Sequence, residues 1–172
     1  LPVEPYVRQY FRGVAEEVLA AYPSDELAAA ALAHLRSATV RKRGATSVRV
    51  FNADEARDGW SSKHTIVEVT LEDMPFLVDS LGMVLNEQNL TIHLMIHPVL
   101  RVRRDRAGRL TAIDDGDQED ASYARESWQH IQIDRIEDPA RLEALRRTIL
   151  RTFDDVRVAV KDWKAMRDRA LE

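Results

Sequence analysis

Histidine and acidic residues recur on the polar sides of three segments that alternate apolar and polar residues, as β-strands do. The alternation places seven side chains on the sheet face away from the predicted core helices: His64, Glu68, His93, His97, Trp128, His130 and Asp134. Imidazoles and carboxylates bind metal ions, so a divalent-metal site is one interpretation. Open sheet faces often carry histidine, so we expect no metal site here. We expect instead that this face is a contact surface covered by another subunit or domain. Protonation near pH 6 is then expected to weaken the contact.

A second group of polar residues surrounds the start of a predicted helix. It comprises Asp73, Met74, Pro75, Phe76, Asp79 and Ser80, with Glu72 just before them. Backbone N–H groups at the start of a helix can bind a carboxylate, and acidic side chains can bind an ammonium group. This loop is therefore a candidate pocket for a small amino-acid effector. The alternative is a helix capped by Asp73, with Pro75 in its first turn and a hydrophilic outer face. The residues leave both interpretations open.

Arginine is concentrated in two short stretches. Arg101, Arg103, Arg104 and Arg106 form a run with the chemistry to bind carboxylate or phosphate. We expect them instead to face the acidic segment Asp114–Asp120 or solvent, because surface charge pairs are common. The stretch Arg41–Arg43 is likewise expected to be solvated charge.

An α+β fold is predicted around the segment His64–Arg104, which combines a strand, a helix and a longer strand. The helix carries an apolar stripe at helical spacing, formed by Leu77, Leu81 and Leu85. In the longer strand one apolar set is expected to face the helices and form the core: Ile92, Leu94, Ile96, Leu100 and Val102.

Strands at 127–135 and 46–52 complete a ferredoxin-like antiparallel sheet with helices on one face. Thr46–Asn52 is assigned to the remaining edge because the sequence after Phe153 stays helical. Pro98 indicates an edge or a bulge in the long strand. The last helix, from Pro139 to about Arg169, would be roughly 45 Å long and overhang the sheet. Its second half must meet the N-terminal helices, a second copy, or another part of the protein.

The composition excludes several classes of function. The 172 residues contain no cysteine and carry a formal net charge of −4, with 31% charged residues. We expect a soluble, cytoplasmic protein that binds neither nucleic acid nor membrane. No glycine-rich dinucleotide loop, Gly-x-Ser-x-Gly elbow or cysteine nucleophile is present. The sequence therefore predicts no catalytic and no cofactor-binding residues in this segment.

The run EVTLEDMPFL, Glu68–Leu77, resembles the first half of an ACT domain. In that family the loop after the first strand reads Asp-x-Pro-Gly-x-Leu. Asp73 and Pro75 match this pattern, while Phe76 stands where the family has glycine. That glycine lets the backbone approach an amino-acid ligand, so the resemblance implies an effector loop that Phe76 would obstruct.

A narrower resemblance covers nearly the whole chain. It is carried by Val50–Asn52, Asp58–Trp60, Asp73–Ser80, Ile96–Asp105 with Gly108, Glu126–Trp128 and Asp155–Arg167. These blocks resemble the N-terminal region of the large bacterial NAD-specific glutamate dehydrogenases. The resemblance implies a non-catalytic piece of a longer, homo-oligomeric enzyme that converts L-glutamate to 2-oxoglutarate with NAD bound elsewhere.

The expected organisation is an N-terminal pair of helices at 1–39, an ACT-like core at 40–153 and a continuation of the last helix at 154–172. Two functions follow from it. One is an allosteric module that senses an amino acid. The other is a ligand-free assembly module that uses the sheet face and the overhanging helix to join domains or subunits.

Overall fold

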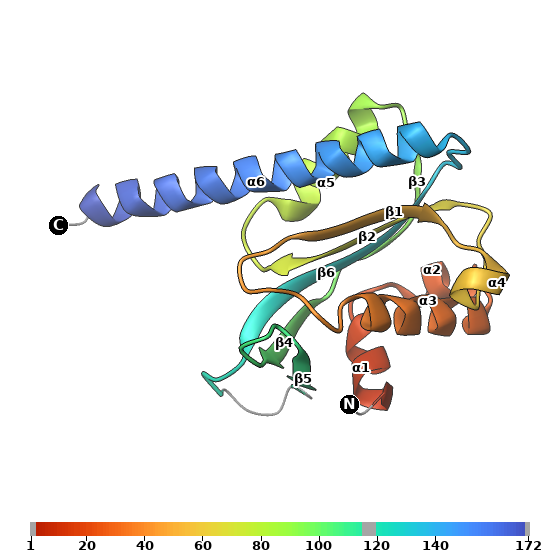
Figure 1. The fold of residues 1–172 in the computed structure, drawn as a ribbon, viewed down its shortest axis with the longest axis horizontal. Coiled ribbons are helices and arrows are strands. Elements are labelled where there is room, and N and C mark those ends of the chain that lie inside the picture. The colour runs from red at the N-terminus through yellow and green to blue at the C-terminus, as the bar shows by residue number, and fades with distance from the viewer. Residues whose placement is uncertain (1–2, 115–119, 171–172) are drawn as a thin grey trace.

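The structure, a computed structural model, describes residues 3–114 and 120–170. An antiparallel sheet lies between two layers of helices (Figure 1). Its strands are β1 (Ser47–Asn52), β2 (Thr65–Glu72), β3 (Ile92–Ile96), β4 (Val99–Arg104), β5 (Leu110–Ile113) and β6 (Ala124–Ile133). The strand order is β1-β2-β6-β4-β5, and β3 also pairs with β6. The predicted antiparallel α+β sheet is confirmed.

The edge strand and the interrupted long strand are placed as the sequence indicates. β1 pairs with β2, with Val48 opposite Val69, so the upstream strand fills the remaining edge of the sheet. The long strand is divided at His97 and Pro98 into β3 and β4. Both parts pair with β6, and the amide of Trp128 donates to the carbonyl of Pro98 across the break. Proline has no backbone N–H group to donate, so Pro98 lies at the break in the strand. Its carbonyl oxygen still accepts a hydrogen bond from β6.

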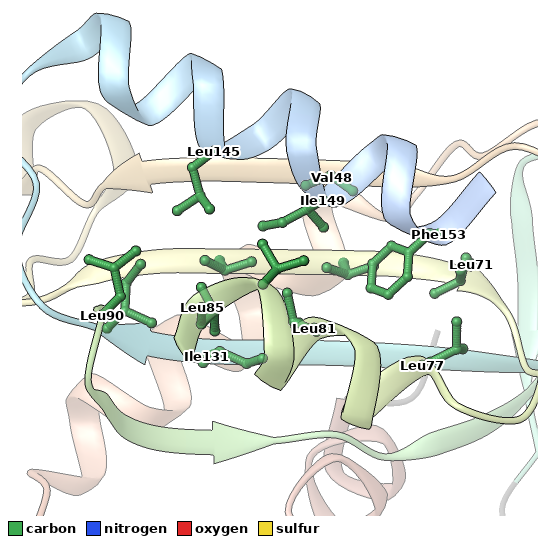
Figure 2. Packing of buried hydrophobic residues seen from close by; sticks show 14 of the residues in the cluster. Val48, Leu71, Leu77, Leu81, Leu85, Leu90, Ile131, Leu145, Ile149 and Phe153 are labelled. Carbon is green, nitrogen blue, oxygen red and sulfur yellow. The ribbon is translucent and has the colours of Figure 1, made fainter. Parts of the chain in front are cut away.

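One face of the sheet is covered by α5 (Leu77–Glu87) and α6 (Pro139–Ala170). The predicted stripe of α5 and the first half of α6 meet over β2 and β6 in a buried apolar core (Figure 2). Its fully buried side chains include Leu81, Leu85, Leu145, Ile149 and Phe153. Burial of this apolar surface is the main force that holds the helix layer on the sheet.

The opposite face is covered by the N-terminal helices α1 (Val3–Tyr10), α2 (Glu16–Ala20) and α3 (Ser24–Ser37) (Figure 1). The sequence predicts two helices in this segment, but the structure has three. The first predicted helix is divided near Gly13, whose φ is +86°. These helices share a second core with the sheet: Tyr6, Tyr10, Leu94, Ile96, Leu100 and Trp128. The short α4 (Glu55–Asp58) lies in the loop between β1 and β2.

The facing predicted for the long strand is wrong. Leu94, Ile96 and Leu100 face the N-terminal helices rather than α5 and α6, while Met95 packs on the α5–α6 core. The register between β3 and β6 shifts between Ile92 and Leu94. One irregular residue moves every following side chain of the strand to the opposite face of the sheet. The alternation of apolar and polar residues alone therefore predicts the wrong face for Leu94, Ile96 and Leu100. No helix in the described part of the chain is long and apolar enough to span a membrane.

Candidate functional site

The predicted effector loop has an unusual backbone at Phe76. This residue is the N-cap of α5, with φ +71° and ψ +7°, and its side chain is 64% exposed. A bulky side chain rarely adopts this left-handed conformation, which glycine adopts freely. The loop therefore has the backbone conformation that favours glycine, although a phenylalanine occupies the position.

The other loop residues do not form the predicted cap. Asp73 does not cap α5: its carboxylate pairs with Arg125 at 3.2 Å, and no side chain caps the helix. Pro75 precedes the helix instead of lying in its first turn. Pro75 and Asp79 are exposed, whereas Met74 packs partly against the apolar core and Ser80 is half-buried. The loop thus projects outward, and Asp73 points toward β6 rather than toward Asp79.

Three members of the predicted contact face are buried by this chain itself. Glu68, Trp128 and His130 lie beneath the N-terminal helices and the loop that contains Trp60. Glu68 accepts hydrogen bonds from Ser37 at 3.2 Å and Arg49 at 2.9 Å. Burial raises the pKa of Glu68 to about 7, although Arg49 and Ser37 oppose the shift. These three residues are therefore unavailable to a partner.

Of the remaining members of that face, His64, His93 and Asp134 are in contact and His97 lies apart. His64 and His93 stack with their ring centroids 4.1 Å apart, and His93 Nε2 lies 2.7 Å from a carboxylate oxygen of Asp134. His97 is exposed at the break between β3 and β4 and does not join them. Within residues 3–114 and 120–170, no three histidine or acidic side chains converge as metal ligands do.

His34 links the N-terminal helices to the sheet and was not singled out from the sequence. Its Nδ1 lies 2.8 Å from the hydroxyl of Tyr10, and its Nε2 lies 3.0 Å from the hydroxyl of Thr70. The ring is fully buried, and burial, with smaller effects of His130 and Arg49, lowers its pKa well below the usual value. In the sequence His34 is recognisable only as one histidine among the small residues of α3. Its role becomes visible only when the packing of α3 against the sheet is known.

The arginine stretches have two different environments. Arg101 pairs with Asp114 at 2.7 Å and Arg103 with Asp120 at 3.2 Å, as expected for the ends of the acidic segment. Residues 115–119 of that segment lie outside the described residues. The prediction that Arg41 is solvated is wrong, because its side chain is 5% exposed and binds Glu126 at 2.6 Å. The expectation for Arg104 is also wrong: it faces neither the acidic segment nor solvent but binds the same carboxylate through two nitrogens, at 2.8 and 3.0 Å.

The second half of α6 extends past the end of the sheet (Figure 1). The apolar stripe that includes Ile149 and Phe153 continues through Val156 and Val160 to Trp163. Ile149 and Phe153 are fully buried, whereas Trp163 is 54% exposed. The same apolar stripe is therefore buried in the core at its N-terminal end and exposed to solvent at its C-terminal end.

The comparisons with known proteins agree with this architecture. Residues 6–149 match the family model described as "Glutamate dehydrogenase, ACT1 domain". The chain belongs to this family. The match covers β1 to β6, the N-terminal helices except the first residues of α1, and α6 as far as Ile149. No solved structure matches the chain significantly.

Two curated relatives are similar to this ACT1 domain over nearly its whole length. The NAD-specific glutamate dehydrogenase of Halomonas elongata is 38% identical over 168 residues, which are 98% of this chain. That of Pseudomonas aeruginosa is 35% identical over 167 residues, or 97% of this chain. The chain spans about 10% of the length of each relative.

Proposed function

We propose that this ACT1 domain is a non-catalytic assembly module of an NAD-specific glutamate dehydrogenase, in which the second half of α6 binds another domain of the same polypeptide. The parent enzyme would oxidise glutamate with NAD in a domain outside this chain, as the names of the relatives suggest. No glycine-rich dinucleotide loop is present in this sequence.

The observation that carries the proposal is the exposed end of the α6 stripe. Val156 lies partly against the core, and Arg157 makes a 2.7 Å hydrogen bond to Thr46. Beyond this point Trp163 and Met166 are more than half exposed. Large apolar side chains on a regular stripe are typical of an interface, where tryptophan often dominates the binding energy. The relatives are about ten times longer than this chain, so the parent offers many other domains as partners.

Substitution of Trp163 tests this proposal in the parent enzyme and in the 172-residue chain. Trp163→Ser should leave the melting temperature of the chain nearly unchanged, because the side chain is already exposed. In the parent enzyme it should cost roughly 1–2 kcal/mol of stability or shift the assembly toward smaller species. Equal effects in both proteins would contradict an interdomain contact.

Val158 provides a matched control on the same helix. It is 60% exposed, but the helical spacing places it on a different side from Val160 and Trp163. Val158→Ser should therefore have little effect in either protein. Concentration-dependent dimerisation of the 172-residue chain, abolished by Trp163→Ser, would identify a second copy as the partner and exclude the interdomain contact.

Sensing of an amino-acid effector at the loop from Asp73 to Ser80 is the second candidate function. It is favoured by the glycine-like backbone at Phe76, which the ACT pattern requires for close approach of a ligand. Calorimetric titration with a panel of amino acids tests it. Heat of binding that is changed by Phe76→Gly would support this function, and no heat at millimolar ligand would exclude it.

A further inference from the structure

A buried cluster with an unbalanced positive charge lies between β4, β6 and the segment before β1. Arg41, Arg104 and Glu126 have side chains that are 5%, 10% and 1% exposed. Both guanidinium groups bind the one carboxylate, which also accepts a hydrogen bond from Trp128 Nε1 at 3.1 Å. Burial acts to raise the pKa of Glu126, but Arg104 and Arg41 outweigh it, so the pKa lies below the usual value. The cluster therefore carries a net charge of +1 at neutral pH.

Arg41 also has an unsatisfied buried donor. Its Nη1 donates to the carbonyl of Ala45 at 2.7 Å and its Nη2 to Glu126, but its Nε has no partner among the described residues. A buried charge is costly unless it is paired, and a buried donor without an acceptor adds to this cost. An anion beside the two guanidinium groups would balance the excess positive charge.

An open cavity of about 840 Å³ adjoins this cluster. Arg41 and Arg104 line it together with Arg43, Arg106 and Arg125. Arg125 is paired with Asp73, whereas Arg43 and Arg106 are exposed and form no ion pair within residues 3–114 and 120–170. The cavity thus has a positive floor and two exposed arginines on its rim.

We propose that this cavity binds a small carboxylate anion. The flat fork of a guanidinium group matches the two oxygens of a carboxylate. Glu72, Asp73 and Asp105 also line the cavity, and they favour a ligand of low total negative charge or one that also bears an ammonium group. They disfavour a phosphate dianion for the same reason. The proposal does not rest on the contact proposed for α6, so either can fail without the other.

Binding is expected to stabilise the connection between the N-terminal helices and the sheet. The amide of Arg41 donates to the carbonyl of Gly108 at 2.9 Å, and the amide of Leu110 donates to that of Thr39 at 2.8 Å. Arg106 lies in the turn that precedes Gly108. An anion held by Arg41, Arg43 and Arg106 would link segment 39–43 to the β4–β5 turn a second time.

Calorimetry and thermal unfolding of the 172-residue chain test the site. Succinate, L-glutamate and inorganic phosphate are titrated at pH 7 and constant ionic strength, which removes general salt effects. A carboxylate should bind with a dissociation constant in the millimolar range or tighter and raise the melting temperature. Arg43→Gln and Arg106→Gln should each weaken binding about fivefold, as expected for one exposed charge contact.

Arg151→Gln is the control, because it removes an exposed arginine of α6 outside the cavity. All three positions are exposed, so the substitutions should leave the fold intact, unlike substitution of the buried Arg41. Equal weakening by Arg151→Gln, tighter binding of phosphate than of either carboxylate, or no binding of a carboxylate at about 20 mM would overturn the proposal.

Discussion

Glu68 is a buried carboxyl group whose ionisation opposes folding. Its Oε1 has no hydrogen-bond partner among the described residues, while Arg49 and Ser37 bind the other oxygen. Burial, only partly offset by Arg49, raises the pKa from 4.5 to about 7. The folded protein therefore holds the Glu68 proton more tightly than the unfolded chain does. Its contribution to stability is complete below pH 4.5 and is lost as the pH rises through about 7.

Glu68 should therefore make the chain less stable as the pH rises from about 4.5 to about 7.5, and Glu68→Gln should remove this loss. The full effect is at most about 3 kcal/mol, from the difference between the two pKa values. Burial lowers the pKa of His130 to about 4 and that of His34 well below its usual value, so both imidazoles act in the opposite sense as the unfolded chain loses their protons near pH 6.5. Both histidines are present in the two proteins, so the difference between the proteins isolates the effect of Glu68. Urea unfolding of both proteins across this range measures the difference. The same pH dependence in the variant would contradict the assignment to Glu68.

Phe76 provides a test of backbone strain. An L-residue in the left-handed region costs on the order of 1 kcal/mol relative to glycine. Phe76→Gly should therefore stabilise the chain by about 0.5–1 kcal/mol, since the side chain it removes is mostly exposed. Phe76→Ala retains a Cβ atom and should give no such gain. Equal stabilisation by both substitutions, measured by urea unfolding, would mean that the side chain and not the backbone causes the effect.

At the scale of elements, alternation and helical spacing predict which segments form strands and helices. β1 at the sheet edge, the α5 stripe and the overhanging α6 are all visible in the residue pattern. The facing of β3 is not visible, because the irregularity beside His93 reverses it without a proline or glycine to mark it. The burial of Arg41 is also hidden, since it depends on Glu126, which is 85 residues away in the sequence.

The turn at Gly108 should be the point where the Arg41 segment is most sensitive to substitution. Gly108 has φ +83°, and a Cβ atom there would lie 2.4 Å from the carbonyl oxygen of Arg41. Gly44 has φ +75° but no atom within 4 Å of such a Cβ. Gly44→Ala should cost about 1 kcal/mol, from backbone conformation alone. Gly108→Ala should cost at least about 1–3 kcal/mol more, because the backbone must move.

Thermal or urea unfolding of these two glycine variants compares the costs directly. Similar losses at the two positions would show that the close approach to Arg41 is not maintained in solution.

At the scale of the molecule, both faces of the sheet are buried by this chain. The sequence suggests a partner protein on the face that carries Glu68 and Trp128, but α1 and α3 cover it. Alternation identifies a face as polar and aromatic, but it cannot tell whether an N-terminal segment folds back onto it. We therefore propose the projecting half of α6, rather than this face, as the surface that meets a partner.

Residues 1–39 should be required for folding, although the sequence suggests a separate segment. A chain that begins at residue 40 would expose Trp128, Leu94, Ile96 and Leu100, which are at most 2% exposed in the structure. Loss of this apolar burial should leave the shortened chain unfolded or aggregated. Circular dichroism and size-exclusion chromatography test this. A monomeric shortened chain with a cooperative transition at an unchanged temperature would show that the N-terminal helices are dispensable.

The central claim is that the exposed end of the α6 stripe is covered by another domain of the parent enzyme. Hydrogen exchange of the α6 amides, compared between the 172-residue chain and the parent, tests it most directly. Residues 158–169 should exchange rapidly in the chain and be strongly protected in the parent, while residues 142–153 are protected in both. Rapid exchange of residues 158–169 in the parent as well would contradict the claim.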